Sequence, residues 1–258
     1  MSLLLDDLGV PLPLSGAPAR VVSLVPSLTE AVAVTAAGLL VGATNYCTHP
    51  AGLDVPRVGG SKYPSVARVL ECAPDLVLAN AEENRREDVE ALRAAGVAVW
   101  VTFPRTLDEA FASLERMFAA LRLPEPGWLA GARAAWAQPP SLSGRVVVPV
   151  WRRPWIVLGG QTFAGDLLAR LGLVNVYADS PDRYPRPSLE EIRGRGADLL
   201  VLPDEPYAFT ATDGPEAFPG LPYTLVSGRH LTWYGPSLRE AREVLTAQLA
   251  SRGSTPRS

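Results

Sequence analysis

The chain repeats one short pattern at a constant offset of 123 residues, and this repeat constrains the fold more than any other feature. Pro64-Ser-Val66 precedes the apolar run Asp75-Leu-Val-Leu78 by 11 residues, and Pro187-Ser-Leu189 precedes Asp198-Leu-Leu-Val201 by the same interval. Each copy predicts a helix that begins after a serine and leads into a buried strand. Internal duplication is the simplest explanation, although short helix–strand units also converge on such patterns. We therefore expect two similar α/β lobes.

Short apolar runs alternate with helical segments along both halves of the chain. Strands are expected at 21–25, 39–43, 75–79, 97–103, 145–150, 156–158 and 199–202. Ser27-Leu-Thr-Glu30 and Thr106-Leu-Asp-Glu109 have the pattern of a capping box, in which a hydroxyl and a carboxyl bond the first free amides of a helix. Strands and helices that alternate at this spacing predict parallel sheets with crossover helices. Both lobes are therefore expected to be Rossmann-like.

The region between the two halves has a helical pattern. Apolar residues follow helical spacing from 107 to 121, prolines interrupt the pattern at 124 and 126, and a second helix is expected at about 127–137. The predicted organisation is a lead-in at 1–19, an N-terminal lobe at 20–105, a helical connector at 106–140 and a C-terminal lobe at 141–258. Such a connector should hold the lobes at a nearly fixed orientation, unlike a flexible Gly/Ser linker.

Composition and charge exclude several classes of protein. Disorder is ruled out for this chain of 258 residues, because 47% are hydrophobic and the net charge is only −3. Basic residues form no cluster, so no nucleic-acid partner is expected. No apolar stretch approaches the ~20 residues of a membrane span, and Asp6 and Asp7 interrupt the start of the chain where a secretion signal would be apolar. We expect a cytoplasmic location for the chain as printed, and a periplasmic or extracellular one if a leader precedes it.

Residues that could carry catalysis or hold a metal are few. Cys47 and Cys72 fit neither a disulfide framework nor a zinc motif, so two free thiols are expected. The chain has no glycine-rich phosphate loop, GxSxG elbow or HExxH motif, and His49 and His230 are its only histidines. Cys47 and His49 could touch a soft metal, but two ligands do not make a protein metal site. We expect no catalytic residue, no resident metal and no cofactor.

Aromatic side chains are concentrated in loops that follow predicted strands. Loops beyond the carboxyl ends of parallel strands form the ligand crevice of α/β sheets. Aromatic rings gathered there suit a large, flat or partly apolar organic ligand, although each ring could equally pack against its own lobe. The residues concerned are Tyr46, Tyr63, Trp151, Trp155, Tyr184, Trp233 and Tyr234. Trp100, Phe111, Phe118 and Trp136 instead have the spacing of core residues.

Several motifs, in this order and at these spacings, resemble the vitamin B12-binding and iron-chelate-binding family of ABC-transporter solute-binding proteins. The resemblance covers about residues 20–250. It implies a fold like that of class III periplasmic binding proteins, with two Rossmann-like lobes and a helical backbone between them. The motifs are Arg20-Val-Val-Ser-Leu-Val-Pro-Ser-Leu-Thr-Glu30, Val41-Gly-Ala-Thr-Asn-Tyr-Cys-Thr-His-Pro50, Val58-Gly-Gly60, Ala73-Pro-Asp-Leu-Val-Leu78, Arg153-Pro-Trp-Ile-Val-Leu-Gly-Gly160 and Leu171-Gly-Leu-Val-Asn-Val176.

The resemblance also implies where a ligand and a partner would bind. In this family the ligand lies between the lobes and touches loop aromatics, and the ligand-binding residues expected here are Tyr46, Tyr63, Trp151, Arg152, Trp155, Tyr184 and Trp233. An arginine suits a carboxylate or phosphate group of the ligand, because its planar fork donates two hydrogen bonds at once. Each lobe of the family carries an exposed acidic residue that meets the permease. Glu190 matches in the second lobe, whereas Ala67 stands at the matching position of the first.

The sequence therefore predicts a monomeric, non-catalytic binding protein for a corrinoid, haem or siderophore-type chelate. A cytoplasmic carrier or sensor of the same ligand class is the first alternative. An enzyme that uses His49 or His230 is the second. An ABC permease is the partner that the family implies, but the change at Ala67 predicts that docking to one is impaired.

Overall fold

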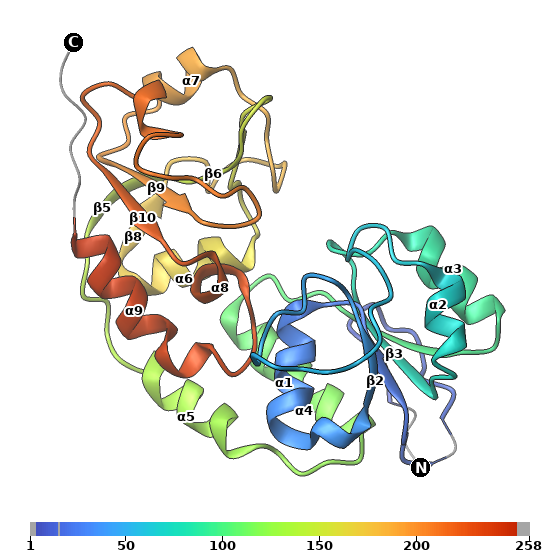
Figure 1. The fold of residues 1–258 in the computed structure, drawn as a ribbon. Coiled ribbons are helices and arrows are strands. Elements are labelled where there is room, and N and C mark those ends of the chain that lie inside the picture. The colour runs from blue at the N-terminus through green and yellow to red at the C-terminus, as the bar shows by residue number, and fades with distance from the viewer. Residues whose placement is uncertain (1–3, 15, 252–258) are drawn as a thin grey trace. The chain divides into compact units, whose positions relative to one another are not determined.

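The computed structural model describes residues 4–14 and 16–251. The chain divides into two compact units, each shown by its strands and helices in Figure 1. Unit 1 comprises Met1–Pro104, Asp108–Ala130 and Tyr234–Pro236, and unit 2 comprises Arg105–Leu107, Gly131–Trp233 and Ser237–Ser258. The α/β class is confirmed, and the domain boundaries expected from the sequence stay a prediction.

Unit 1 is built on a parallel sheet of four strands in the order β2-β1-β3-β4. The strands are β1 (Val21–Ser23), β2 (Leu40–Ala43), β3 (Leu76–Asn80) and β4 (Ala98–Thr102). The helices are α1 (Pro26–Ala36), α2 (Val66–Glu71), α3 (Arg86–Ala94) and α4 (Leu107–Ala120), and the 3-10 turn η1 (Ala37–Leu39) follows α1. Every residue of β3 and β4 is buried, as parallel strands covered by helices on their faces should be.

Unit 2 is built on a parallel sheet in the order β10-β9-β5-β8, with a small antiparallel ribbon of β6 and β7. The strands are β5 (Gly144–Val147), β6 (Pro149–Trp151), β7 (Ile156–Val157), β8 (Leu173–Asn175), β9 (Leu199–Pro203) and β10 (Tyr223–Val226). The helices are α5 (Gly127–Trp136), α6 (Phe163–Leu171), α7 (Leu189–Gly194), α8 (Gly228–Thr232) and α9 (Leu238–Ala250), and η2 (Pro215–Ala217) is a 3-10 turn. The first four residues of α5 belong to unit 1, and the first residue of α4 belongs to unit 2.

The two sheets have the same topology. In chain order, the strands of each sheet run second, first, third and fourth from one edge to the other. Ser65 caps α2 by accepting the amide of Arg68, and Ser188 caps α7 by accepting the amide of Glu191. Both helices of the repeated pattern therefore form as predicted, and the expectation of two similar lobes is confirmed.

One predicted cap is wrong. The helix that was expected to begin after Ser27 begins at Pro26, with Val25 as its N-cap residue and no side-chain cap. Proline at the first helical position needs no amide partner, so the helix can start there. Ser27 is buried inside the first turn instead. The sequence analysis also assigned no element to β8, β10, α8 or α9.

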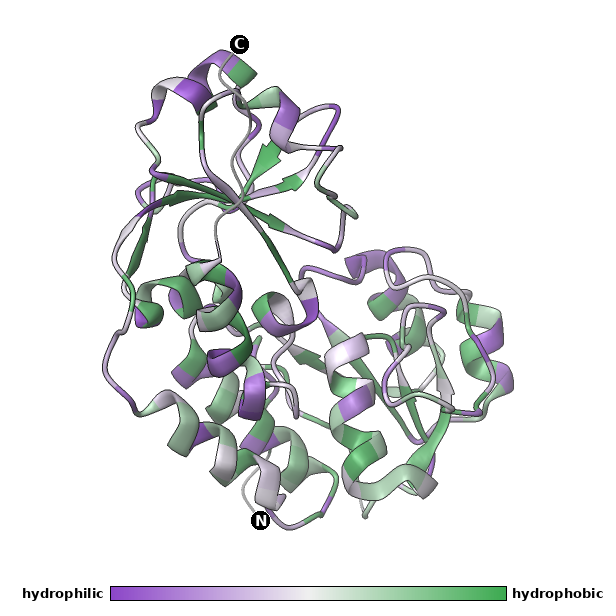
Figure 2. Ribbon diagram, turned by 60° about the vertical axis from the view of Figure 1, so that its left-hand side comes forward, coloured by the Kyte–Doolittle hydropathy of each residue, from purple (hydrophilic) through white to green (hydrophobic). Residues whose placement is uncertain are grey.

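The cores of the two units are apolar and continuous. Figure 2 shows green, hydrophobic strands beside helices that alternate between green and purple along their length. Trp100, Phe111, Phe118 and Trp136 are all buried, as their spacing predicted. Among residues 4–14 and 16–251, no helix is long and apolar enough to cross a bilayer.

Candidate functional site

Two exposed tyrosines lie on loops near the carboxyl ends of the strands in unit 1. Tyr46 follows β2 and is 66% exposed, and Tyr63 lies in the loop before α2 and is 69% exposed. The Arg85 guanidinium lies 4.8 Å from the centre of the Tyr63 ring, a distance suited to a cation–π contact. The Tyr46 ring passes so close to Gly60 that a Cβ there would lie 3.4 Å from it. Both rings are predicted site residues, and both present most of their surface to solvent.

Backbone and amide hydrogen bonds fasten these two loops to each other. Asn45 donates its amide to the carbonyl of Gly59 at 2.8 Å. The Asn84 side chain donates to the carbonyl of Ser61 at 2.8 Å and to that of Leu24 at 3.3 Å. Gly59 has a φ of +104°, a conformation that favours glycine, and a Cβ there would lie 3.2 Å from the Tyr63 carbonyl oxygen. These hydrogen bonds therefore hold the loops that carry Tyr46 and Tyr63 in place.

The thiol next to Tyr46 points into the core. Cys47 is fully buried, and Thr29 donates a hydrogen bond to its sulfur at 3.0 Å. Burial raises the pKa of the Cys47 thiol, so it stays protonated and is a poor ligand for a metal. Cys47 and Cys72 are both free, as predicted. Within the part of the chain that the structure describes, no three His, Cys, Asp or Glu side chains gather as a metal site.

Unit 2 carries a group of aromatic rings around Trp155. The Trp155 ring stacks on Phe209 at 6.2 Å between ring centres with 3° between the planes, and it meets the edge of Phe218 at 5.3 Å. Tyr207 lies 4.6 Å from Phe209 and meets Trp151 edge-on at 5.6 Å. The sequence analysis predicted the two tryptophans but missed the other three rings. Two of those, Tyr207 and Phe209, come soon after the buried strand β9, which is the signal that could have identified them.

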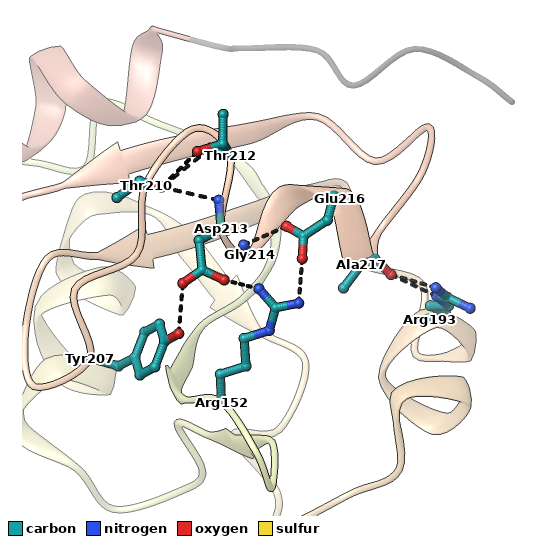
Figure 3. Close-up of polar contacts among 9 residues, drawn as sticks. All are labelled: Arg152, Arg193, Tyr207, Thr210, Thr212, Asp213, Gly214, Glu216 and Ala217. Carbon is teal, nitrogen blue, oxygen red and sulfur yellow. Dashed lines mark hydrogen bonds and ion pairs between the residues drawn. The ribbon is translucent and has the colours of Figure 1, made fainter.

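The predicted ligand-binding arginine pairs with two carboxylates of its own unit. In Figure 3, one terminal nitrogen of Arg152 donates to Asp213 and the other donates to Glu216. The Tyr207 hydroxyl donates to the second oxygen of Asp213 at 2.6 Å. Burial by itself would raise the pKa of Glu216, but hydrogen bonds from the Gly214 amide and from Arg152 outweigh it and leave this pKa lowered. Both carboxylates come from the loop 204–222, far from Arg152 in sequence.

Tyr184 is held by a close approach of two backbone segments. The amide of Val157 donates to the Pro185 carbonyl at 3.1 Å, and the amide of Gly159 donates to the Arg183 carbonyl at 2.8 Å. A Cβ at the next residue, Gly160, would lie 2.6 Å from the Ala178 carbonyl oxygen, so only glycine fits there. This packing leaves the Tyr184 side chain 43% exposed.

Trp233 differs from the other predicted rings because it is only 8% exposed. Glu205 accepts a hydrogen bond from its side chain, and the Arg229 guanidinium lies 5.9 Å from the ring centre. Burial raises the pKa of Glu205. Trp233 therefore offers a ligand little surface. The next residue, Tyr234, belongs to unit 1, where its hydroxyl lies 2.7 Å from both the Asn80 amide nitrogen and the Thr102 hydroxyl.

The two histidines occupy different settings. His230 Nδ1 lies 2.8 Å from the Ser227 hydroxyl, and its Nε2 lies 3.0 Å from a Glu240 carboxylate oxygen. This Ser–His–Glu chain links α8 to α9, and the Glu240 side chain is 57% exposed. His49 lies in the loop after β2, with its Nδ1 3.1 Å from the Thr48 hydroxyl. The chain of three resembles a catalytic triad in its contacts, but the serine lies at a helix start without the strained elbow that typically exposes a nucleophile.

The predicted docking position of each unit lies on its serine-capped helix. Glu190 is the second residue of α7, after the Ser188 cap, and it is exposed. Ala67 is the second residue of α2, after the Ser65 cap, and it is exposed too. The two positions are therefore equivalent in structure, with a carboxylate in unit 2 and a methyl group in unit 1.

Comparison of the sequence with curated proteins finds relatives of one kind. A vitamin B12-binding protein from Vibrio cholerae serotype O1 is 27% identical over 186 residues, which is 67% of this chain. The chain covers 66% of that relative's length, just under two thirds. A vitamin B12-binding protein from Photorhabdus laumondii is 28% identical over 200 residues, covering 73% of this chain and 72% of the relative. No protein-family model matches the chain.

Comparison of the structure finds the same fold in solved proteins. The periplasmic vitamin B12 binding protein BtuF of Vibrio cholerae superimposes with a TM-score of 0.70 at 20% identity, over 90% of this chain and 97% of that one. The periplasmic heme-binding protein RhuT from Roseiflexus sp. RS-1 gives a TM-score of 0.73 at 22% identity, over 90% and 98%. BhuT, a periplasmic heme-binding protein solved with two hemes, gives 0.68 at 23% identity, over 91% and 98%. At these identities the likeness establishes the fold.

Proposed function

Since the chain belongs to the ABC-transporter solute-binding proteins of the cobalamin and iron-chelate type, we propose that it binds a metal–organic chelate and does not transform it. The curated relatives are named for vitamin B12 and two of the solved structures for heme, so a corrinoid and a haem are the leading ligands. These ligands share a large flat macrocycle with polar groups at its edge. The proposed site must therefore offer flat apolar surface.

One observation carries this proposal: both units expose aromatic side chains, on loops and at the end of β6, at the ligand-binding edge of a parallel sheet. Tyr46, Tyr63, Trp151 and Tyr184 are each more than 40% exposed. Exposed aromatic rings at this edge of a sheet support the proposal of a binding surface there. The rings that we propose as ligand contacts are Tyr46 and Tyr63 in unit 1, and Trp151, Tyr184 and the half-buried Trp155 in unit 2.

The ligand class is tested directly with purified protein. Mass spectrometry of the material released by denaturation would identify a ligand carried through purification. Titration with cyanocobalamin and with haemin, followed by the absorbance of each, would then give the two dissociation constants. Binding of neither compound, with no ligand released from the protein, would refute the proposal.

Substitutions test the proposed ring contacts. Loss of a well-packed aromatic contact often costs about 2 kcal/mol, or roughly thirtyfold in dissociation constant. Trp155→Ala and Tyr184→Ala should each weaken binding by about this factor. Val174→Ala is the matched control, because Val174 is an exposed apolar residue on β8. Unchanged affinity in both aromatic variants would mean that these rings pack only against their own unit.

We also propose Glu190 as a contact to a permease, as the family resemblance implies. It lies exposed on α7, and an exposed carboxylate can pair with arginines of a membrane partner. Docking in the family uses one such residue in each lobe, so Ala67 leaves unit 1 without its ionic contact.

The cellular location of the protein is a separate question. The solved structures compared above are of proteins named as periplasmic, whereas the cytoplasmic location expected for this chain stays a prediction. Cell fractionation with a compartment marker would decide between the two.

A further inference from the structure

Arg152 directs its charge inward, toward the loop 204–222. Its two terminal nitrogens pair with Asp213 and with Glu216, and only 13% of its side chain is exposed. The carboxylates are much more open, at 41% and 48% exposure. A ligand carboxylate that took up the same two-point pairing would have to displace both intramolecular partners. Arg152 is therefore poorly placed to bind the ligand directly.

Each carboxylate is itself fixed by the loop that carries it. Asp213 accepts a hydrogen bond from the Tyr207 hydroxyl at 2.6 Å, and its amide donates to the Thr210 hydroxyl at 3.0 Å. Glu216 accepts from the Gly214 amide at 2.6 Å. Figure 3 shows the Asp213 and Glu216 carboxylates meeting the guanidinium from the same side. The loop therefore presents two oriented acceptors, one to each terminal nitrogen of the guanidinium.

The far end of the loop is tied to α7. Nε and one terminal nitrogen of Arg193 donate to the Ala217 carbonyl at 2.9 and 2.6 Å (Figure 3). Ala217 is the last residue of the 3-10 turn η2, which also contains Glu216. The carboxylate that meets Arg152 thus stands on a turn whose end is held by a neighbouring helix.

The same arginine covers one face of a proposed ligand ring. The guanidinium carbon of Arg152 lies 5.4 Å from the Trp155 ring centre, within range of a cation–π contact. Phe209 and Phe218, which stack on this ring and meet its edge, come from the loop that holds Asp213 and Glu216. Trp155 is therefore oriented by one arginine and two rings that a single ion-paired loop keeps together.

We propose that Arg152 is a positioning residue, which with Asp213 and Glu216 fixes the orientation of the Trp155 ring for the ligand. We call these three side chains the Arg152 clamp. This inference rests on the proposed function for the role of Trp155, and it replaces the sequence-based prediction that Arg152 contacts the ligand. It makes the two carboxylates part of the binding machinery although neither touches the ligand.

The discriminating experiment compares two ways of breaking the clamp. Arg152→Gln removes the guanidinium, whereas the double variant Asp213→Ala, Glu216→Ala keeps it and removes the two acceptors of its terminal nitrogens. A positioning role predicts that both weaken binding of haemin or cyanocobalamin by a similar factor, about tenfold. If Arg152 contacted the ligand, the double variant would bind as well as the unchanged protein or better, and that result would overturn the proposal. Arg152→Lys, which can pair with one carboxylate as a point charge, should restore part of the affinity.

A second readout needs no ligand. The emission of Trp155 is obtained by subtracting the spectrum of Trp155→Phe from that of the protein, and the same subtraction is made in each clamp variant. The Trp155 emission should shift to longer wavelength in Arg152→Gln and in the double variant, because the ring becomes more exposed to water. Arg68→Gln, which removes an exposed arginine of unit 1, is the control and should leave this emission unchanged.

The two readouts separate failure of this inference from failure of the proposed function. If the unchanged protein binds neither haemin nor cyanocobalamin, the proposed function fails, and the emission of Trp155 still decides whether the clamp orients the ring. An emission that does not move in either clamp variant would refute the positioning role even where binding is normal.

Discussion

The Asp198 carboxylate accepts a hydrogen bond from the backbone amide of Arg145 at 2.8 Å, at the point where β9 and β5 begin to pair. The Arg145 side chain in turn donates to the carbonyl of Gly196 at 2.9 Å. Unit 1 contains the same arrangement. There Asp75 accepts the amide of Arg20 at 2.9 Å, and the Arg20 side chain donates to the Ala73 carbonyl at 2.9 Å.

We call these hydrogen bonds between the aspartate, the arginine and the backbone the joint of each unit. The joint fixes the start of the two central strands in each unit. It explains why an aspartate precedes the buried strand in both copies of the repeated pattern. Ala73 and Gly196 occupy the same place in the two joints, and both have a positive φ, of 44° and 71°. The two residues differ in their side chains but share this backbone conformation. The units are therefore alike in local backbone conformation as well as in topology.

The joint predicts a stability effect at its aspartate. Asp198→Ala removes the acceptor of the Arg145 amide, and loss of one such hydrogen bond costs about 1 kcal/mol. Urea unfolding should show a lower midpoint with an unchanged slope. Asp182→Ala, which removes an exposed carboxylate of the same unit, is the control. Equal stability of the two variants would mean that the joint contributes nothing.

The packing behind Tyr184 predicts a strict need for glycine. In Gly160→Ala the new Cβ would lie 2.6 Å from the Ala178 carbonyl oxygen and 2.7 Å from that of Ser180, so the backbone must move. Overpacking of this kind costs about 1–3 kcal/mol, and the movement should also displace Tyr184 and weaken ligand binding.

The matched control for this glycine lies at the end of α7. Gly194 is helical, and a Cβ at this position would meet no atom within 4 Å, so Gly194→Ala should leave binding unchanged. Because alanine favours a helix more than glycine does, this variant should also stabilise the protein by up to about 1 kcal/mol. Thermal unfolding and a haemin titration of both variants provide the measurement. Tolerance of alanine at Gly160 would contradict the packing argument.

The buried hydroxyl of Tyr234 predicts a cost for its removal. It contacts the Asn80 amide and the Thr102 hydroxyl, both at 2.7 Å, in the core of unit 1. Tyr234→Phe would leave the Asn80 amide without this acceptor, which costs about 1–3 kcal/mol when the group is buried. Tyr223→Phe, on the edge strand β10, should change stability by much less. Equal unfolding midpoints would show that the Tyr234 bonds are energetically neutral.

Glu240 predicts a pH dependence of stability. Its hydrogen bond with His230 is the main cause of a lowered pKa, and a bond from Arg229 adds to it. A carboxyl whose folded pKa lies below its unfolded value stabilises the fold above the unfolded pKa, and this stabilisation is lost as the pH falls through the folded value. The carboxylate is largely exposed, so the contribution is at most about 1 kcal/mol.

The test compares two acidic residues of the same helix. Between pH 7 and pH 3, stability should fall less steeply for Glu240→Gln than for the unchanged protein, because one such carboxyl has been removed. Glu243→Gln, three residues further along α9, should keep the full pH dependence. Parallel curves for the Glu240 variant and the unchanged protein would refute the coupling to His230.

Local patterns predicted much of the fold and little of the side-chain pairing. The caps at Ser65 and Ser188 and the buried strands that follow them depend on residues close in sequence, so the pattern alone identifies them. The partners of Arg152 lie 61 and 64 residues away, and no local signal marks them. Trp233 was expected to face a ligand, but it is buried and bonds Glu205 of the loop 204–222, a contact that no local pattern marks.

The equivalence of Ala67 and Glu190 leads to a prediction about transport, which rests on the proposed docking role of Glu190. Both residues are exposed and stand second in a serine-capped helix, one in each unit. Exposed ion pairs are individually worth only about 0–1 kcal/mol, so docking depends on several of them acting together. With a methyl group at Ala67, we expect the protein to stimulate a cobalamin-type permease weakly.

Ala67→Glu should restore the missing contact and raise ligand uptake into vesicles that contain the permease, with the protein supplied outside. The second residue of a helix also suits a carboxylate, because it lies near the positive end of the helix dipole, so the variant should fold normally. Leu70→Glu adds the same charge at another exposed position of α2 and should have no effect on uptake if the position matters. Strong stimulation by the unchanged protein, equal to that by a relative with both carboxylates, would show that docking does not need a charge at Ala67.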